Sequence, residues 1–162
     1  MSSPLSITPG QPRADTYREL LPQLLAIIEA ERNCIAALAN VSAALYQAFG
    51  FHWVGFYIVR GDELVLGPFQ GPVACTRIAK GKGVCGTAWA TETTQLVPDV
   101  HAFPGHIACS SRTQSEIVVP VRDERGKVWA VLDIDSDRLD DFSDVDQDAL
   151  EQVASWLSGH ND

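Results

Sequence analysis

The chain has 162 residues, of which 46% are hydrophobic, and this length favours a single domain around one buried core. Its formal net charge of -9 at pH 7 opposes binding to nucleic acid or to anionic membrane lipid. No apolar run approaches the roughly 20 residues of a membrane span, and the N-terminal residues lack the basic and apolar regions of a secretion signal. We therefore expect a cytoplasmic protein whose ligand is a cationic or zwitterionic small molecule.

The first part of the chain is predicted to be a flexible arm followed by two helices. Prolines and small polar residues fill the start, so we expect an N-terminal arm over residues 1–14 and a folded domain over residues 15–160. Leucine and isoleucine recur at helical spacing from Asp15 to Glu31, which predicts the first helix. The second helix is predicted from Cys34 to Phe49, with Ile35 on its buried stripe.

The rest of the chain is predicted to be mainly strands, followed by a terminal helix. Alternating patterns predict two hairpins, one formed by His52 to Val59 and Glu63 to Phe69, the other by Ser115 to Val121 and Val128 to Asp135. The last helix is predicted from Ser143 to Ser158, where Ser143 and Asp146 approximate a capping box and Val145 lies on the apolar side. This order predicts an α+β fold, with a central antiparallel sheet, N- and C-terminal helices packed on one face, and the active site on the other.

A glycine-rich segment lies between the two hairpins. Cys75 to Ile78 is predicted to be a short extended piece, and Gly81 to Gly86, with the sequence GKGVCG, leads into a short helix over Thr87 to Thr91. The glycine spacing matches neither a P-loop nor a dinucleotide-binding fingerprint. We therefore expect these glycines to allow close approach of the backbone rather than to bind phosphate.

The segment from Gln95 to Ser110 is predicted to be a surface loop that carries reactive side chains. Proline and glycine interrupt regular structure there, yet His101, His106 and Cys109 lie in the same segment. Loops held open by a rigid scaffold are where reactive groups meet a substrate. We interpret Cys109 as a working thiol, whereas the two histidines can also be ordinary loop residues.

The four cysteines indicate thiol chemistry rather than a structural framework. A chain of this size without a secretion signal has no need of structural disulfides. No CxxC or HxxxH pair is present, so the sequence predicts no metal site. Cys34 fits a small buried hydrophobe in a helix, whereas Cys75, Cys85 and Cys109 lie within one third of the chain and favour redox chemistry.

Acidic residues lie on strand faces that oppose the apolar faces. Glu116 points away from the apolar set of its strand, and Asp133 and Asp135 lie two apart in VLDID. Trp53 and Tyr57 project the same way, so one sheet that joins the apolar faces creates an acidic and aromatic pocket. The acids could instead be solvated strand residues, but Asp is disfavoured in strands and crowded like charges destabilise a sheet. We expect the pocket to bind an ammonium group and to keep one carboxyl group protonated as an acid.

Five motifs of this chain occur together in one known family. They are GPFQGPVACTRI, GKGVCGTAWA, VPDVHAFPGHIACSS, SEIVVPV and VLDIDS. In this order they resemble the free methionine-(R)-sulfoxide reductases, which are single GAF domains, and the resemblance covers roughly residues 51–136. It implies a GAF domain over residues 15–160 that reduces free methionine (R)-sulfoxide, and not the residue within proteins, with electrons from thioredoxin. The resemblance implies no cofactor.

The resemblance also implies roles for the cysteines. Cys109 in HIACSS corresponds to the nucleophile, Cys75 in ACTRI to the resolving cysteine, and Cys85 in GVCGT to an auxiliary thiol. In this mechanism Cys109 attacks the sulfoxide sulfur and becomes a sulfenic acid, which condenses with Cys75 to a disulfide that thioredoxin reopens.

The substrate pocket of the family corresponds to the acidic and aromatic face described above. Its residues in this chain are Trp53, Tyr57, Glu116, Asp133 and Asp135. Asp133 is expected to hold the substrate ammonium group, and Glu116 or Asp135 to donate a proton to the departing oxygen. Two alternatives stay open: a non-catalytic GAF module that binds a small ligand or senses redox state, and a peptide methionine sulfoxide reductase. The oligomeric state is also open, and a homodimer is one possibility.

Overall fold

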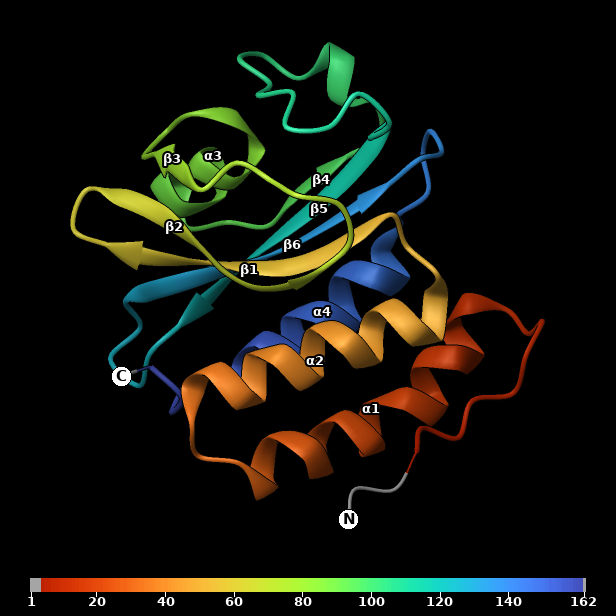
Figure 1. The fold of residues 1–162 in the computed structure, drawn as a ribbon. Coiled ribbons are helices and arrows are strands. Elements are labelled where there is room, and N and C mark those ends of the chain that lie inside the picture. The colour runs from red at the N-terminus through yellow and green to blue at the C-terminus, as the bar shows by residue number, and fades with distance from the viewer. Residues whose placement is uncertain (1–3, 162) are drawn as a thin grey trace.

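The computed structural model describes residues 4–161, and its centre is a six-stranded antiparallel sheet with the strand order β3-β2-β1-β6-β5-β4 (Figure 1). The strands are β1 Trp53–Arg60, β2 Glu63–Gln70, β3 Arg77–Ala79, β4 Gln95–Val97, β5 Ser115–Arg122 and β6 Val128–Ser136. Three helices cover one face of the sheet: α1 (Arg13–Ala30), α2 (Cys34–Phe49) and α4 (Asp144–Trp156). The short helix α3 (Gly83–Thr91) and the 3-10 turn η1 (Val100–Ala102) lie over the other face.

The alternation of residues along the strands produces two separate buried clusters. Phe56, Ile117 and Leu132 belong to the larger cluster, between the sheet and helices α1, α2 and α4. Tyr57 and Val118 belong to the smaller one, beneath α3. The predicted α+β fold and the predicted directions of the strand faces are confirmed. The pattern specifies these directions because a shift of the strand register by one residue would expose the whole apolar set.

The boundaries of several elements differ from the predictions. Helix α3 begins at Gly83 and not at Thr87, so Cys85 is helical and buried. Gly83 has a φ of 62°, which glycine adopts at low cost, and this allows the helix to begin inside the glycine-rich segment. Within the predicted loop, β4 pairs with β5 over Gln95–Val97, and η1 follows. The sequence did not predict these two elements, because elements of three residues are too short to produce a periodic pattern.

Two predicted core positions are exposed instead. Ile35 and Val145 have exposed fractions of 64% and 39%. Each lies in the first turn of its helix beside a buried residue, Cys34 in α2 and Asp146 in α4. Successive helix residues point about 100° apart, so the neighbour of an inward residue turns toward solvent. The predicted capping box of Ser143 and Asp146 is present at the start of α4.

The predicted arm, residues 1–14, is described from residue 4 onward, and residues 1–3 lie outside the described residues. Helix α1 already begins at Arg13. The Ser6 amide donates to Gln23 Oε1 at 2.9 Å, and the Thr8 hydroxyl donates to Glu19 Oε1 at 2.8 Å. These bonds place residues 4–12 along α1, and the flexibility of the arm stays a prediction. Within residues 4–161, no helix combines the length and apolar character that crossing a membrane requires.

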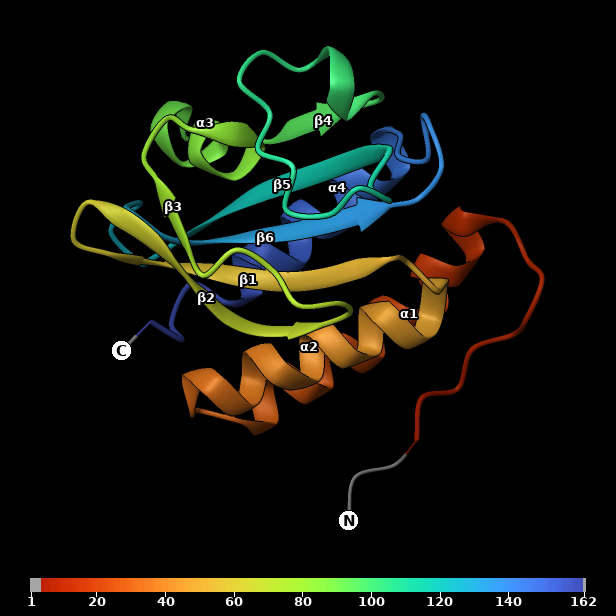
Figure 2. The same cartoon turned by 45° about the horizontal axis from the view of Figure 1, so that its top comes forward.

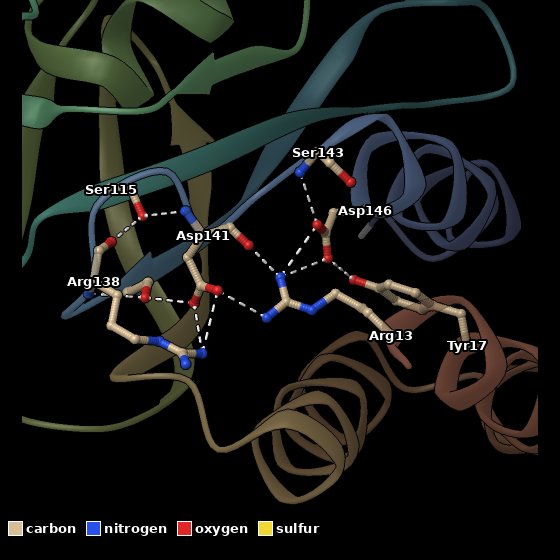
Figure 3. A network of polar contacts seen from close by, with 8 residues as sticks. Arg13, Tyr17, Ser115, Arg138, Asp141, Ser143 and Asp146 are labelled. Carbon is tan, nitrogen blue, oxygen red and sulfur yellow. Dashed lines mark hydrogen bonds and ion pairs between the residues drawn. The ribbon is translucent and has the colours of Figure 1, made fainter. Parts of the chain in front are cut away.

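A polar network connects α1 to the ends of the neighbouring strands β5 and β6 (Figure 3). Arg13 forms ion pairs with Asp141 at 3.0 Å and with Asp146 at 3.2 Å. The Ser136 hydroxyl donates to Asp141 Oδ2 at 2.6 Å, and the Asp141 amide donates to Ser115 Oγ at 3.3 Å. Because Ser115 and Ser136 pair with each other and directly adjoin Glu116 and Asp135, the network fixes the strand ends that carry two of the predicted site residues.

Candidate active site

A disulfide connects Cys75 and Cys109. The two cysteines lie in irregular segments, one between β2 and β3 and the other between η1 and β5 (Figure 2). The two Cα atoms are 5.6 Å apart, although the cysteines are separated by 34 positions in the sequence. Both residues are half-buried. A half-buried disulfide in irregular segments can be approached from solvent, as a redox-active disulfide requires.

The three predicted acids lie on neighbouring strands beneath this disulfide. Glu116 of β5 pairs with Asp135 of β6, and Asp133 lies two residues before Asp135 on the same face. Glu116 and Asp133 are only 7% and 5% exposed. Asp133 Oδ1 and Asp135 Oδ1 are buried without a hydrogen-bond partner. Buried carboxyl oxygens without a hydrogen-bond partner are unusual in a folded protein unless a ligand completes the site.

Burial and mutual repulsion raise the pKa values of these groups. Desolvation raises the pKa of Glu116 well above its usual value, and the charges of Asp133 and Asp135 raise it further. Desolvation likewise raises the pKa of Asp135 well above its usual value, and the charge of Asp133 adds to the effect. The pKa of Asp133 is also raised by burial, although hydrogen bonds from Glu116, Asp135 and Cys85 oppose the shift. The site can therefore hold a proton on a carboxyl group near neutral pH.

Aromatic side chains form one wall of the pocket. Trp53 lies opposite Asp135 in the β1–β6 ladder and stacks on Phe69 with 5.2 Å between ring centroids. The Trp53 indole donates to Pro72 O at 3.1 Å, and the Tyr57 hydroxyl donates to Cys75 O at 2.8 Å. The two aromatic residues therefore hold the segment that carries Cys75, besides lining the pocket.

Gly55 makes this aromatic wall possible, and sequence reasoning did not single it out. A Cβ atom at Gly55 would lie 2.3 Å from Phe69 Cβ and 2.7 Å from the Trp53 ring. Both distances are far below a van der Waals contact, so only glycine permits this packing. A glycine inside the aromatic strand WVGFY was the available signal.

Cys85 differs from the other two cysteines of the segment. It is a free thiol in α3, only 6% exposed, and it faces the carboxyl groups from the helix side. Burial raises its pKa well above the usual value, and the charges of Asp133 and Glu116 raise it further. Cys85 is thus protonated at neutral pH, and a thiol is a poor nucleophile.

The structure brings all eight predicted site residues to one cavity. Seven line it directly, namely Trp53, Tyr57, Cys85, Cys109, Glu116, Asp133 and Asp135, and Cys75 reaches it through its disulfide. Sequence reasoning missed other lining residues, including His52, Lys82, Ser110 and Thr113. His52 Nε2 lies 3.2 Å from Ser110 Oγ, which is next to Cys109. Of the two loop histidines, His106 lines the cavity, whereas His101 is exposed beside Asp99 at 3.3 Å.

Known proteins are similar to this chain over most of its length. The GAF domain model matches residues 33–160. GAF domain-containing protein A of Dictyostelium discoideum is 53% identical over 158 residues, 97% of this chain and 99% of that protein. The free methionine-R-sulfoxide reductase of Escherichia coli is 44% identical over 146 residues, 90% of this chain and 88% of that protein. The structure of free methionine-R-sulfoxide reductase from Neisseria meningitidis, in complex with its substrate, has a TM-score of 0.93 and 48% identity, covering 97% of this chain and 94% of that chain. The chain belongs to the GAF domain family of free methionine-R-sulfoxide reductases.

Proposed function

We propose that the protein reduces free L-methionine (R)-sulfoxide to L-methionine through a cysteine relay. The observation that carries this proposal is the Cys75–Cys109 disulfide above a cavity with buried carboxyl groups. The disulfide supplies a two-electron redox couple, and the carboxyl groups supply proton donation and recognition of an ammonium group. Relatives that cover most of this chain are free methionine-R-sulfoxide reductases.

The first chemical step takes place at Cys109. Its thiolate attacks the sulfoxide sulfur, and the carboxyl group of Glu116 or Asp135 gives a proton to the sulfoxide oxygen. This attack forms a bond between Cys109 Sγ and the substrate sulfur. That bond and the sulfur–oxygen bond then break as the oxygen, with its proton, transfers to Cys109 Sγ and forms a sulfenic acid. The substrate sulfur gains two electrons and Cys109 loses two, so methionine is released.

The second step resolves the sulfenic acid. The Cys75 thiol attacks the sulfur of Cys109, a disulfide forms, and the hydroxyl group leaves as water. The positions of Cys75 and Cys109 support this pairing, since they already meet in a disulfide. Cys85 is proposed to be an auxiliary thiol, because its raised pKa keeps it from acting as a thiolate in the main relay.

Substrate recognition is assigned to the aromatic and acidic walls. Asp133, with an unpartnered buried oxygen, is proposed to accept the substrate ammonium group. Trp53 is proposed to pack on the S-methyl end of the substrate, opposite Asp135. An amino acid with a free ammonium group satisfies the buried carboxylates, whereas a residue within a peptide has no such group.

Thioredoxin is the reductant that we propose, and a reducing compartment such as the cytoplasm is the matching location. Thioredoxin supplies a thiolate that attacks one sulfur of the disulfide and a second thiol that completes the exchange. The half-buried disulfide at the cavity is accessible to this attack. Two electrons pass from thioredoxin to the Cys75–Cys109 pair in each cycle.

An NADPH-coupled assay with thioredoxin and thioredoxin reductase tests the function. We expect NADPH oxidation with free methionine (R)-sulfoxide, and none with the S epimer or with a sulfoxide-containing peptide. Cys109→Ser is the control for reduction that does not pass through the site. Equal rates with the peptide would support a peptide reductase, and binding of the free sulfoxide without turnover would support a non-catalytic GAF module.

A further inference from the structure

Cys85, Glu116 and Asp133 form a cluster of ligand atoms that the sequence did not predict. One atom from each, the thiol sulfur and two carboxylate oxygens, lies within 4.8 Å of the others. The residues come from α3, β5 and β6, so no short motif connects them. A tetrahedral zinc ion holds its ligand atoms about 3.5 Å apart, so side-chain shifts of about 1 Å would close the cluster around an ion.

The cluster has negative groups but no positive partner. The three residues are 6%, 7% and 5% exposed, in the order Cys85, Glu116 and Asp133. Asp133 Oδ1 has no hydrogen-bond partner, and within residues 4–161 no lysine or arginine forms an ion pair with Glu116 or Asp133. Buried carboxylates need a cation or a proton, and a positively charged ligand can replace the protons that burial keeps on these groups.

We propose that this cluster binds one Zn²⁺ ion in the absence of substrate. The thiolate of Cys85 favours zinc over magnesium or calcium, which bind oxygen ligands. The three protein ligands leave the fourth position of a tetrahedral site open to water. The cavity volume of about 50 Å³ accommodates an ion with a few water molecules.

Zinc and the substrate ammonium group compete for the same carboxylates. When zinc binds, the Cys85 thiol loses its proton to solvent and the carboxylates of Glu116 and Asp133 become zinc ligands. Free zinc therefore occupies the pocket and inhibits the enzyme in competition with methionine sulfoxide. This inhibition rests on the proposed function, whereas the binding of zinc does not.

Direct binding is tested on the protein with the Cys75–Cys109 disulfide intact, so that neither of these cysteines can be a ligand. Co²⁺ reports a thiolate ligand through its charge-transfer absorption, and calorimetry with Zn²⁺ gives stoichiometry and affinity. We expect one site, with no competition from a large excess of Mg²⁺. Cys85→Ala should remove the absorption band and weaken zinc binding at least about tenfold, because the lost ligand contributes more than 1.4 kcal/mol.

Two further variants separate loss of a ligand from loss of the fold. Glu116→Gln keeps the size of the side chain and should weaken zinc binding at least about tenfold. Cys34→Ala removes a buried cysteine of α2, in the larger cluster on the opposite face of the sheet, and should leave both the band and the affinity unchanged. A Cys85→Ala protein that folds and binds zinc like wild type, or the absence of a saturable site in wild type, would overturn the proposal.

Competition is measured with the reduced Cys75→Ser/Cys109→Ser protein, which cannot turn over the sulfoxide. Free methionine (R)-sulfoxide should abolish the Co²⁺ band, and the N-acetylated sulfoxide should leave it in place. Persistence of the band with bound sulfoxide would overturn the competition. A protein that binds zinc through Cys85 but shows no reductase activity would refute the proposed function and leave the zinc site standing.

Discussion

The two faces of the central sheet are made by the same strands but bury different kinds of side chain. On the helix side, Leu132 and Ile134 are fully buried among apolar side chains. On the α3 side, the intervening Asp133 is 5% exposed with one oxygen unpartnered. The helix face thus contributes the larger share of the hydrophobic free energy of folding, whereas the other face also keeps polar groups in a state that favours ligand binding over stability. Substitutions on the helix face should therefore lower stability and leave activity nearly unchanged, whereas substitutions on the α3 face should lower activity and leave stability nearly unchanged.

The largest effect is expected at Cys109. Cys109→Ser should abolish turnover, because a serine hydroxyl is not ionised at neutral pH and cannot replace the thiolate. The free energy of unfolding of the reduced protein should change little, since the residue is half-buried in an irregular segment. Steady-state kinetics and chemical denaturation measure the two quantities. Retention of about a tenth of the wild-type rate would assign the nucleophile to another residue.

Glu116→Gln should have the next largest effect on activity. Loss of the proton donor lowers kcat by roughly 10²- to 10⁴-fold, with a smaller change in KM. At pH 7 the variant should be no less stable than wild type. Folding raises the pKa of Glu116, so the contribution of this carboxyl group to wild-type stability is present at acid pH and is lost as pH rises through the raised pKa. Between pH 5 and pH 8, the thermal unfolding temperature should fall more steeply with rising pH for wild type than for Glu116→Gln. A kcat within a factor of two of wild type would transfer the proton donor to Asp135.

Asp133→Asn should act mainly on KM. Loss of a charge-assisted contact with the substrate ammonium group costs about 1.5–3 kcal/mol, or roughly 10- to 150-fold in binding. N-acetylation of the substrate should damage wild type to a similar extent and add little to the variant, because both changes remove one contact. Wild-type activity on N-acetylmethionine sulfoxide would contradict recognition of the ammonium group by the acidic wall.

Leu132→Ala, on the opposite face next to Asp133, should have the smallest effect on activity and a large one on stability. Leu132 is fully buried in the larger cluster, so truncation should cost about 2–5 kcal/mol in the free energy of unfolding. At a temperature where the variant is folded, its kcat/KM should stay close to wild type. Urea denaturation with kinetics on the same sample checks both, and a loss of activity without a loss of stability would contradict the division between faces.

The sequence predicted most of the fold because the alternation is strong where the strands are long. The apolar set of Phe56, Ile117 and Leu132 leaves one register that buries it, and this register also collects Glu116, Asp133 and Asp135 on the opposite face. The short elements were not predictable in this way. Strand β4 and turn η1 have three residues each and carry no period.

Several properties of the site depend on contacts that are distant in the chain. The residues alone did not determine which cysteine would meet Cys109, and only the family resemblance indicated Cys75. The cluster of Cys85 with Glu116 and Asp133 has no local spacing signal, because α3, β5 and β6 meet only in the folded protein. The need for glycine at position 55 likewise comes from Phe69 on the next strand.

A single-turnover experiment on the reduced protein tests the relay most directly. The protein is mixed with excess free methionine (R)-sulfoxide and no reductant, methionine is quantified, and disulfide-linked peptides are identified by mass spectrometry. We predict about one methionine per protein and one cross-linked pair of peptides, which contain Cys75 and Cys109. Release of methionine with Cys109 linked to Cys85, or with no intramolecular disulfide, would contradict the relay.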